Sequence, residues 1–353
     1  MDRFRVGVTR DFLTSTGDIA MGDIGLEALR HAPGVSVEFF SEHLPEVSPR
    51  QIAGLDAVLS LAPRYSRATF GGGATTLSVL ARFGVGYDMV DVQALTDHDV
   101  ILTITPDGVR RPMATAIMTL LLALAHELLA KDRMTRAGLW KERSNLKTTG
   151  LTGRVFGAVG LGNIGREVFR LLKPFEMVHL ATDPFVKPGE VADLGVELVD
   201  LETLLRRSDF VSLHCPLTPD TVKLMGEREF SWMKPTAYLI NASRGPVVDQ
   251  AALYRTLKER KIRGAALDVF EKEPVPDDEP ILKLDNVILT PHTLCWTDEC
   301  FRKMGESAVN AVLTVLKGEV PPHVVNREVL EKPALRAKLN ANRNRWQSLM
   351  PVG

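Results

Sequence analysis

The chain has 353 residues, a formal net charge of −1, 45% hydrophobic residues and 25% charged residues. This length suits two domains better than one core, and the composition is that of a folded globular protein. The near-neutral charge favours neither nucleic-acid binding nor an acidic disordered tail. The most apolar stretch, 114–130, contains His126 and Glu127 and is shorter than a membrane span. We therefore expect neither a nucleic-acid nor a membrane partner.

Cysteine usage and the N-terminal residues favour a cytoplasmic protein. Cys215, Cys295 and Cys300 form no CxxC pair and no even disulfide framework, which is typical of a reduced intracellular chain. The N-terminal sequence MDRFRVGVTRDF lacks the apolar segment of a secretory signal. Beside His292, the last two cysteines lack the fourth ligand and the spacing of a tetrahedral site, so no metal is expected.

In chain order, short apolar runs alternate with helical patterns from the N-terminus to Thr105. Strands are predicted over 4–9, 35–40, 56–61, 77–83 and 100–105, and helices over 25–31 and 90–96. This alternation indicates a parallel sheet covered by helices. Pro106-Asp107-Gly108 is predicted to break the chain, and a long helix is predicted over 111–137.

A second alternating series begins near Arg154. Its predicted strands lie in RVFGAVG (154–160), MVHLATD (177–183), FVSLHCP (210–216), TAYLINAS (236–243), GAALDVF (264–270) and NVILTPH (286–292). Its predicted helices cover 165–172, 201–207 and 250–260.

These patterns predict an α/β protein of two doubly wound domains. We expect a Rossmann domain over 107–290, inserted in a discontinuous, flavodoxin-like substrate domain of 1–106 and 291–353. A helix over 307–317 is expected to pack back on the first unit. The charged stretch 326–353 is expected to form a surface helix or a partly frayed tail.

A glycine-rich turn, GLGNIG, lies between the strand RVFGAV and a helical pattern. Gly160 permits the tight turn, Gly162 admits a pyrophosphate, and Gly165 lets the helix pack closely on the strand. The next strand ends in Asp183, 18 residues after the last glycine, where a carboxylate can accept hydrogen bonds from a ribose. A carboxylate at this position would repel the 2′-phosphate of NADP, and Lys187 is the only nearby cation that could bind this phosphate. We therefore expect NAD rather than NADP.

Three polar residues follow late strands of the second series, where parallel sheets bind ligands. Arg244 can hold a carboxylate and polarise a ketone, because its planar fork is bidentate. His292 can deliver a proton, because its pKa lies near working pH. Glu273 can hold the histidine's tautomer and keep it protonated. The three predict the catalytic group of an enzyme that interconverts a 2-keto acid and a 2-hydroxy acid, with the hydride coming from the cofactor.

The sequence resembles the D-isomer-specific 2-hydroxyacid dehydrogenases, which include phosphoglycerate dehydrogenases, glyoxylate/hydroxypyruvate reductases and D-lactate dehydrogenases. The resemblance rests on six blocks in the correct order. They are RFGVGYD (82–88), GLTGRVFGAVGLGNIGREV (150–168), DFVSLHCPLTPDT (209–221), LINASRGPVVD (239–249), GAALDVFEKEP (264–274) and NVILTPHT (286–293).

The resemblance implies the same catalytic roles for Arg244, Glu273 and His292, and the D configuration of the hydroxy acid. It implies that Asp268 holds the nicotinamide carboxamide. It also places Cys215 and Pro216 at the adenosine and ribose part of the cofactor, and His214 is expected there from its position at a strand end. The other expected cofactor residues are Asn163, Ile164, Thr221, Ala242 and Ser243. The resemblance also implies that Val85 and Gly86 bind the substrate carboxylate through their N–H groups. Homodimers that pair through the cofactor domain are typical of the family, which suggests a subunit interface at the helix 114–130 and at Trp140.

Some positions depart from the family pattern and leave the substrate open. Met89 replaces an Asn after the Tyr-Asp of the RFGVGYD block, and Met113-Ala114-Thr115 replaces Val-Ala-Glu. Arg64 and Trp296 are the candidates for choosing among 2-keto acids, the first by binding a polar or anionic group and the second by excluding bulky ones. We expect small polar substrates of the glyoxylate/hydroxypyruvate or phosphoglycerate type.

Two alternatives remain open from the sequence. The first is a dinucleotide-sensing interaction protein, as in co-repressors that share this fold. The second is oxidation of a small acid such as phosphite. Formate is disfavoured, because formate dehydrogenases of this fold pair the histidine with glutamine where this chain has Glu273.

Overall fold

The computed structural model describes residues 3–73 and 75–349. The chain divides into two compact units, one of Met1–Val109 with Trp296–Gly353 and one of Arg110–Cys295. We call them unit 1 and unit 2. The second unit interrupts the first, with boundaries after Val109 and Cys295, where the sequence predicted them after Pro106 and Thr290.

Unit 1 contains a five-stranded parallel sheet. Its strands are β1 (Phe4–Val8), β2 (Val35–Phe39), β3 (Ala57–Ser60), β4 (Val79–Arg82) and β5 (Ile101–Thr103). They lie in the order β2-β1-β3-β4-β5, with every pairing parallel. This is the flavodoxin-like order, whose switch point lies between β1 and β3. The predicted fold class is confirmed for this unit.

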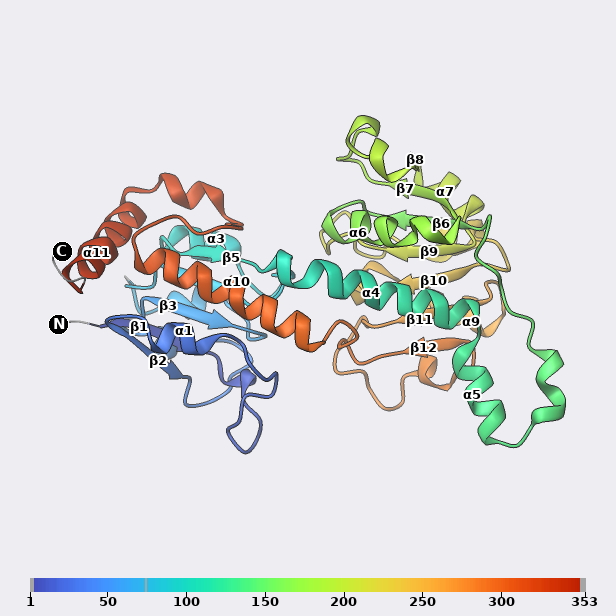
Figure 1. Cartoon of the computed structure of the whole chain (residues 1–353), viewed down its shortest axis with the longest axis horizontal. Helices are drawn as coiled ribbons and strands as arrows, with labels where there is room; N and C mark the ends of the chain where they lie inside the picture. Colours follow the sequence, from blue (N-terminus) through green and yellow to red (C-terminus); the bar gives the residue numbers. More distant parts are fainter. Residues whose placement is uncertain (1–2, 74, 350–353) are drawn as a thin grey trace. The chain divides into compact units, whose positions relative to one another are not determined.

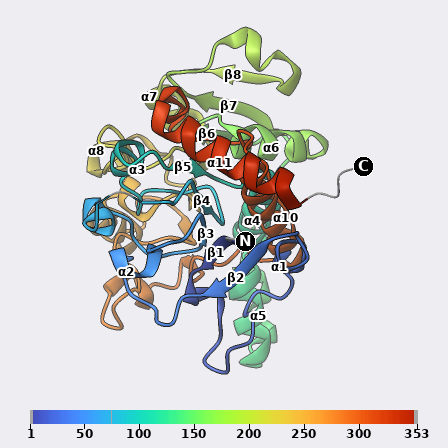
Figure 2. The ribbon, with the colours of Figure 1, turned by 90° about the vertical axis from the view of Figure 1, so that its left-hand side faces the viewer.

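Helices cover both faces of this sheet, so the residues of β3, β4 and β5 are almost all buried, while the edge strand β2 is only partly buried. Figure 2 shows α1 (Leu26–Arg30) and α10 (Asp298–Leu316) on one side and α2 (Pro49–Ile52) and α3 (Val92–Asp97) on the other. The helix α10 begins earlier than predicted, because Thr297 caps it by accepting a hydrogen bond from the Cys300 N–H.

Unit 2 contains a seven-stranded parallel sheet. Its strands are β6 (Val155–Val159), β7 (Val178–Thr182), β8 (Val196–Leu198), β9 (Phe210–Leu213), β10 (Tyr238–Asn241), β11 (Gly264–Leu267) and β12 (Val287–Leu289). They lie in the order β12-β11-β10-β9-β6-β7-β8. This is the Rossmann order with one additional strand, and it reverses direction between β6 and β9.

The helices of unit 2 also form two layers. In Figure 1, α6 (Asn163–Leu172) and the long helix α4 (Pro106–Ala125) lie in front of the strands. The other layer contains α7 (Leu201–Arg207), α8 (Glu227–Trp232) and α9 (Gln250–Lys258), which contact one another in sequence order. The short elements β8, α2 and α8 were not predicted.

The predicted helix over 111–137 is wrong in both its start and its continuity. Pro106 begins α4 instead of breaking the chain, because a proline in the first helical turn loses no intrahelical hydrogen bond. Glu127 then adopts a left-handed conformation with φ 48°, which separates α4 from α5 (Leu128–Arg136). By length and composition α4 could cross a membrane, but 67% of its apolar window is buried inside the protein, as in a core helix.

The C-terminal segment packs on unit 1 instead of fraying. Asn326 is buried and hydrogen-bonds the Leu102 N–H and the Val100 carbonyl of the β5 region. In the helix α11 (Pro333–Leu349), the Lys338 Nζ donates to three backbone carbonyls, including that of Leu77 at 2.8 Å. Residues 350–353 of the predicted tail lie outside the described residues.

Candidate active site

The predicted cofactor residues gather at the carboxyl edge of the unit 2 sheet, where its strand order reverses. The glycine-rich turn follows β6, and His214 to Pro216 follow the adjacent strand β9. The two segments are joined by the His214 N–H, which donates to the Val159 carbonyl at 2.7 Å. Ligands bind to doubly wound sheets at this position.

The glycine-rich turn has the close contacts that glycine permits. Gly160 has φ +96°, and a Cβ there would lie 2.7 Å from the Cys215 backbone nitrogen. A Cβ on Gly165 would lie 2.7 Å from the Gly160 carbonyl oxygen, so the helix α6 can approach β6 only with glycine at this position. A Cβ on Gly162, by contrast, would meet no atom within 4 Å. The turn therefore leaves open space before the N-terminus of α6, which suits a pyrophosphate.

Asp183 follows β7 beside this turn. Its carboxylate accepts hydrogen bonds from the Leu161 N–H at 2.7 Å and the Phe185 N–H at 2.9 Å. These bonds fix the carboxylate against the glycine-rich turn, and its remaining lone pairs can accept from ribose hydroxyls. A 2′-phosphate at the same place would meet a like charge.

His214 carries an unpartnered polar atom in the same region. Its Nε2 is buried and has no hydrogen-bond partner among the described residues. Burial lowers the pKa of His214 to about 4, so the imidazole is neutral at pH 7. Burial also raises the pKa of the neighbouring Cys215 thiol to about 11, so the thiol is protonated at pH 7. A buried ring nitrogen without a partner is consistent with a group that a bound cofactor completes.

The remaining predicted cofactor residues also lie at the carboxyl edge of the unit 2 sheet. Asn163 and Ile164 form the first turn of α6, and Ala242 and Ser243 follow β10. Thr221 shapes its own loop, because its hydroxyl donates to the Pro216 carbonyl at 2.6 Å and accepts from the Thr218 N–H at 2.7 Å.

His292 and Glu273 form a direct pair. The His292 Nδ1 lies 2.7 Å from the Glu273 Oε2, and the Phe270 N–H donates to the other carboxylate oxygen at 2.9 Å. The hydrogen bond that the Glu273 carboxylate accepts from His292 raises the pKa of His292, against the opposing effect of burial. Burial opposes ionisation of Glu273, but its bonds to His292 and to Phe270 lower its pKa below the ordinary value. The pair therefore favours imidazolium beside carboxylate, with Nε2 left for a substrate.

Arg244 is placed near this pair by the glycine that follows it. A Cβ on Gly245 would overlap the Phe270 carbonyl, so only glycine lets the loop after β10 meet the loop after β11. The Arg244 backbone is held by Asn241, whose side-chain amide donates to the Arg244 carbonyl at 3.0 Å. The guanidinium charge reaches both members of the pair, since it lowers the pKa of His292 and of Glu273 among the smaller contributions.

Asp268 has contacts that the sequence did not predict. Its buried carboxylate accepts from the Thr290 hydroxyl at 2.6 Å and from the N–H groups of Thr293 and Leu294 at 3.1 and 3.3 Å. The donors lie before and after His292 in the chain, and His292 itself adopts a left-handed φ of 56°. Asp268 therefore holds the loop that presents the histidine, and its predicted contact with the carboxamide stays a prediction.

The predicted substrate residues belong to unit 1. Val85 and Gly86 are half-buried, and within residues 3–73 and 75–349 their N–H groups have no hydrogen-bond acceptor. The Arg64 side chain is exposed after β3. Trp296 is 48% exposed and makes an edge-to-face contact with Phe301, with ring centroids 5.6 Å apart.

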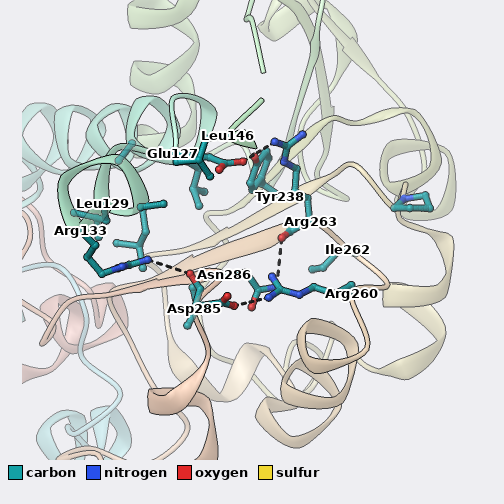
Figure 3. A pocket seen from close by; sticks show the side chains of 16 residues that line it. Glu127, Leu129, Arg133, Leu146, Tyr238, Arg260, Ile262, Arg263, Asp285 and Asn286 are labelled. Carbon is teal, nitrogen blue, oxygen red and sulfur yellow. Dashed lines mark hydrogen bonds and ion pairs between the residues drawn. The ribbon is translucent and has the colours of Figure 1, made fainter. Parts of the chain in front are cut away.

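A hollow of about 470 Å³ lies elsewhere in unit 2, and none of the predicted site residues lines it. Figure 3 shows Glu127 facing Arg263, and Arg260 beside Asp285, at its wall. Both pairs are ion pairs at 2.5 Å. Among the described residues no group of three metal-binding side chains occurs.

The Rossmann order, the glycine-rich turn with its acid and the His–Glu pair beside an arginine together define a dinucleotide-dependent oxidoreductase. Residues 118–293 match the family model of the D-isomer specific 2-hydroxyacid dehydrogenase, NAD binding domain. The chain is 41% identical to a glyoxylate reductase of Korarchaeum cryptofilum over 80% of this chain and 86% of that protein. It belongs to the D-isomer-specific 2-hydroxyacid dehydrogenases, as the sequence predicted, and NAD is its cofactor.

Two further relatives illustrate the range of substrates in this family. The chain is 42% identical to a D-3-phosphoglycerate dehydrogenase of Methanocaldococcus jannaschii, over 72% of this chain and 48% of that protein. The structure of a D-lactate dehydrogenase from Aquifex aeolicus, complexed with NAD and lactic acid, superposes with a TM-score of 0.80 at 26% identity. That alignment covers 91% of this chain and 99% of the other.

Proposed function

We propose that this enzyme reduces small polar 2-keto acids of the glyoxylate and hydroxypyruvate type, with His292 as the proton donor. The observation that carries the assignment of the donor is the 2.7 Å pair of His292 and Glu273 at the carboxyl edge of the unit 2 sheet. The glyoxylate reductase among its relatives supports the substrate class.

Each member of the trio has one task in this reaction. Arg244 binds the substrate carboxylate and polarises the keto oxygen. His292 donates its Nε2 proton to that oxygen as the alcohol forms, and it leaves the step neutral. Glu273 accepts from Nδ1–H throughout, which fixes the ring orientation and favours the protonated form before the step. The bound nicotinamide supplies the hydride.

The cofactor is held by the edge of unit 2, which serves as the NAD-binding domain. The turn at Gly160 to Gly165 and the first turn of α6 bind the pyrophosphate, and Asp183 binds the adenosine ribose. The remaining proposed contacts are His214, Cys215, Pro216, Thr221, Ala242, Ser243 and Asp268.

Unit 1 serves as the substrate domain. The unpartnered N–H groups of Val85 and Gly86 support a role in binding the substrate carboxylate. Arg64 is proposed to interact with polar or anionic substituents, and Trp296 to limit bulky ones.

We also propose a cytoplasmic homodimer that pairs through unit 2. The segment from α5 to Asn145 buries none of its residues in this chain, although it carries large apolar side chains. Leu128 is 56% exposed and Trp140 is 64% exposed. A second copy that covers this segment would remove the apolar surface from water. Sedimentation equilibrium should therefore give twice the chain mass, and Trp140→Glu should shift the protein towards monomer.

The substrate assignment is tested by the rate of NADH oxidation with glyoxylate, hydroxypyruvate, pyruvate, 3-phosphohydroxypyruvate and a branched keto acid. The first two should give the highest kcat/KM. Absence of turnover with every acid, despite NADH binding, would instead favour a dinucleotide-sensing interaction protein.

A further inference from the structure

The hollow in unit 2 lies at the amino edge of the sheet, opposite the active site. Its lining includes Tyr238 at the start of β10, Arg263 directly before β11 and Val287 at the start of β12. The carboxyl ends of the same three strands lead to the three catalytic residues. Strands of this length keep the two ends of the sheet roughly 10 Å apart, at about 3.3 Å per residue. A ligand in the hollow can therefore bind without displacing the substrate.

The charged side chains of the hollow do not balance. Three arginines and two acids line it, which gives a formal charge of +1. The two acids, Glu127 and Asp285, form ion pairs at 2.5 Å with Arg263 and Arg260 respectively. The third arginine, Arg133, has no ion-pair partner in the described part of the chain, and its Nη2 donates to the Asp285 carbonyl at 3.3 Å. The guanidinium of Arg133 can therefore pair with an anion from solution.

Apolar side chains form the wall beside Arg133. Leu129 lies one turn before Arg133 on the same face of α5, and Figure 3 shows the two side by side at the hollow. Leu129 is 40% exposed and Leu146 is half-buried, so a ligand that contacts them removes apolar surface from water. The volume of about 470 Å³ is in the range of small-molecule sites.

We propose that the hollow is a second binding site of unit 2, for a small organic anion whose charged group binds Arg133 and whose apolar body packs against Leu129 and Leu146. The fork of an arginine suits a carboxylate or a phosphate group. An inorganic anion lacks the apolar body, and a neutral compound lacks the charge. The site is distinct from the proposed dimer contact, because Leu128 and Trp140 do not line the hollow.

The test titrates the enzyme with benzoate by isothermal titration calorimetry. NAD⁺ and oxamate, an unreactive analogue of a 2-keto acid, are present at saturation to fill the active site. Benzoate should bind with a Kd of about 1 mM, and benzyl alcohol and inorganic phosphate should bind more weakly. Arg133→Ala should raise the Kd for benzoate about five- to tenfold, and Leu129→Ser about threefold.

Two variants are matched controls for the loss of the Arg133 charge. Lys131→Ala removes an exposed cation of α5 that does not line the hollow, so the Kd for benzoate should not change. Arg133→Lys keeps the charge and should bind benzoate more tightly than Arg133→Ala. Equal affinity of Arg133→Ala and the unmodified enzyme, or no binding of benzoate to either, would overturn the inference.

Two further measurements exclude other occupants. Tighter binding of benzoate when oxamate is left out would place benzoate in the active site and overturn the inference. A shift of Arg133→Ala towards monomer in sedimentation equilibrium, with no benzoate binding to the unmodified enzyme, would instead assign the hollow to a second copy of the chain. None of these measurements requires turnover, so a failure of the proposed function would be seen separately in the keto-acid assay.

Discussion

The acids around His292 in unit 2 and the predicted carboxylate-binding groups of unit 1 differ in how they are bonded. In unit 2, Glu273 is bonded to both His292 and the Phe270 N–H, and Asp268 accepts bonds on both sides of the histidine. In unit 1, the N–H groups of Val85 and Gly86 have no hydrogen-bond acceptor within residues 3–73 and 75–349. A group that moves a proton needs an orientation fixed by the protein before substrate arrives.

The difference suggests a division of labour between the two edges. In the proposed reaction, the unit 2 edge carries the proton transfer. The unit 1 edge leaves hydrogen-bonding capacity for the ligand, which is where one 2-keto acid can be told from another. Changes in unit 2 should therefore affect all substrates alike, and changes in unit 1 should affect them selectively.

The largest expected effect is that of His292→Ala. Reduction of every keto acid should fall by about 100-fold or more, because the proton donor is lost. Steady-state kcat with saturating NADH measures this, and NADH fluorescence titration should show unchanged cofactor binding. A variant that keeps more than half of the kcat would show that His292 is not the proton donor.

Glu273→Gln should shift the alkaline limb of the pH profile of kcat/KM to lower pH, because the variant loses the charge that is paired with His292. Glu273 raises the pKa of His292, so the imidazolium persists to higher pH than in an isolated histidine. Reduction needs that proton and is lost as pH rises through the pKa. Glutamine removes the charge, the pKa falls, and the alkaline limb of kcat/KM should move to lower pH. The limb of the Glu271→Gln control should stay in place, and an unmoved limb in Glu273→Gln would contradict the pairing.

Much of the carboxyl edge of the unit 2 sheet could be predicted from the sequence, and there are physical reasons why some of its contacts could not. The strands and the glycine-rich turn have local signals in apolar runs and in residue spacing. The contact of Gly245 with Phe270 and the bonds of Asp268 to the histidine loop join separate strands, so spacing does not reveal them.

The fold shows the same limit. The strand β8 has three residues and the helix α2 has four, too few to establish a period. The helix breaks at Glu127, which adopts a left-handed conformation. Because this residue is neither Gly nor Pro, the sequence contains no signal for the break. The charged C-terminal stretch suggested solvent exposure, but the Lys338 ammonium is held by backbone carbonyls.

Asp183→Asn should narrow the preference for NADH over NADPH by about tenfold. Asparagine keeps an acceptor for the Leu161 N–H, so the glycine-rich turn should hold its shape while the charge that repels a 2′-phosphate disappears. The ratio of kcat/KM for the two cofactors measures the change. Equal efficiency of the unmodified enzyme with both cofactors would refute this role for Asp183.

Arg64→Ala should have the smallest and most selective effect. The exposed guanidinium can pair with an anionic or hydroxyl substituent, so kcat/KM for 3-phosphohydroxypyruvate and hydroxypyruvate should fall about three- to tenfold. Pyruvate should be spared, since its methyl group offers no partner. Arg50→Ala, another exposed arginine of unit 1, should leave every ratio unchanged. A branched keto acid as best substrate, with Arg64→Ala silent throughout, would place substrate choice elsewhere.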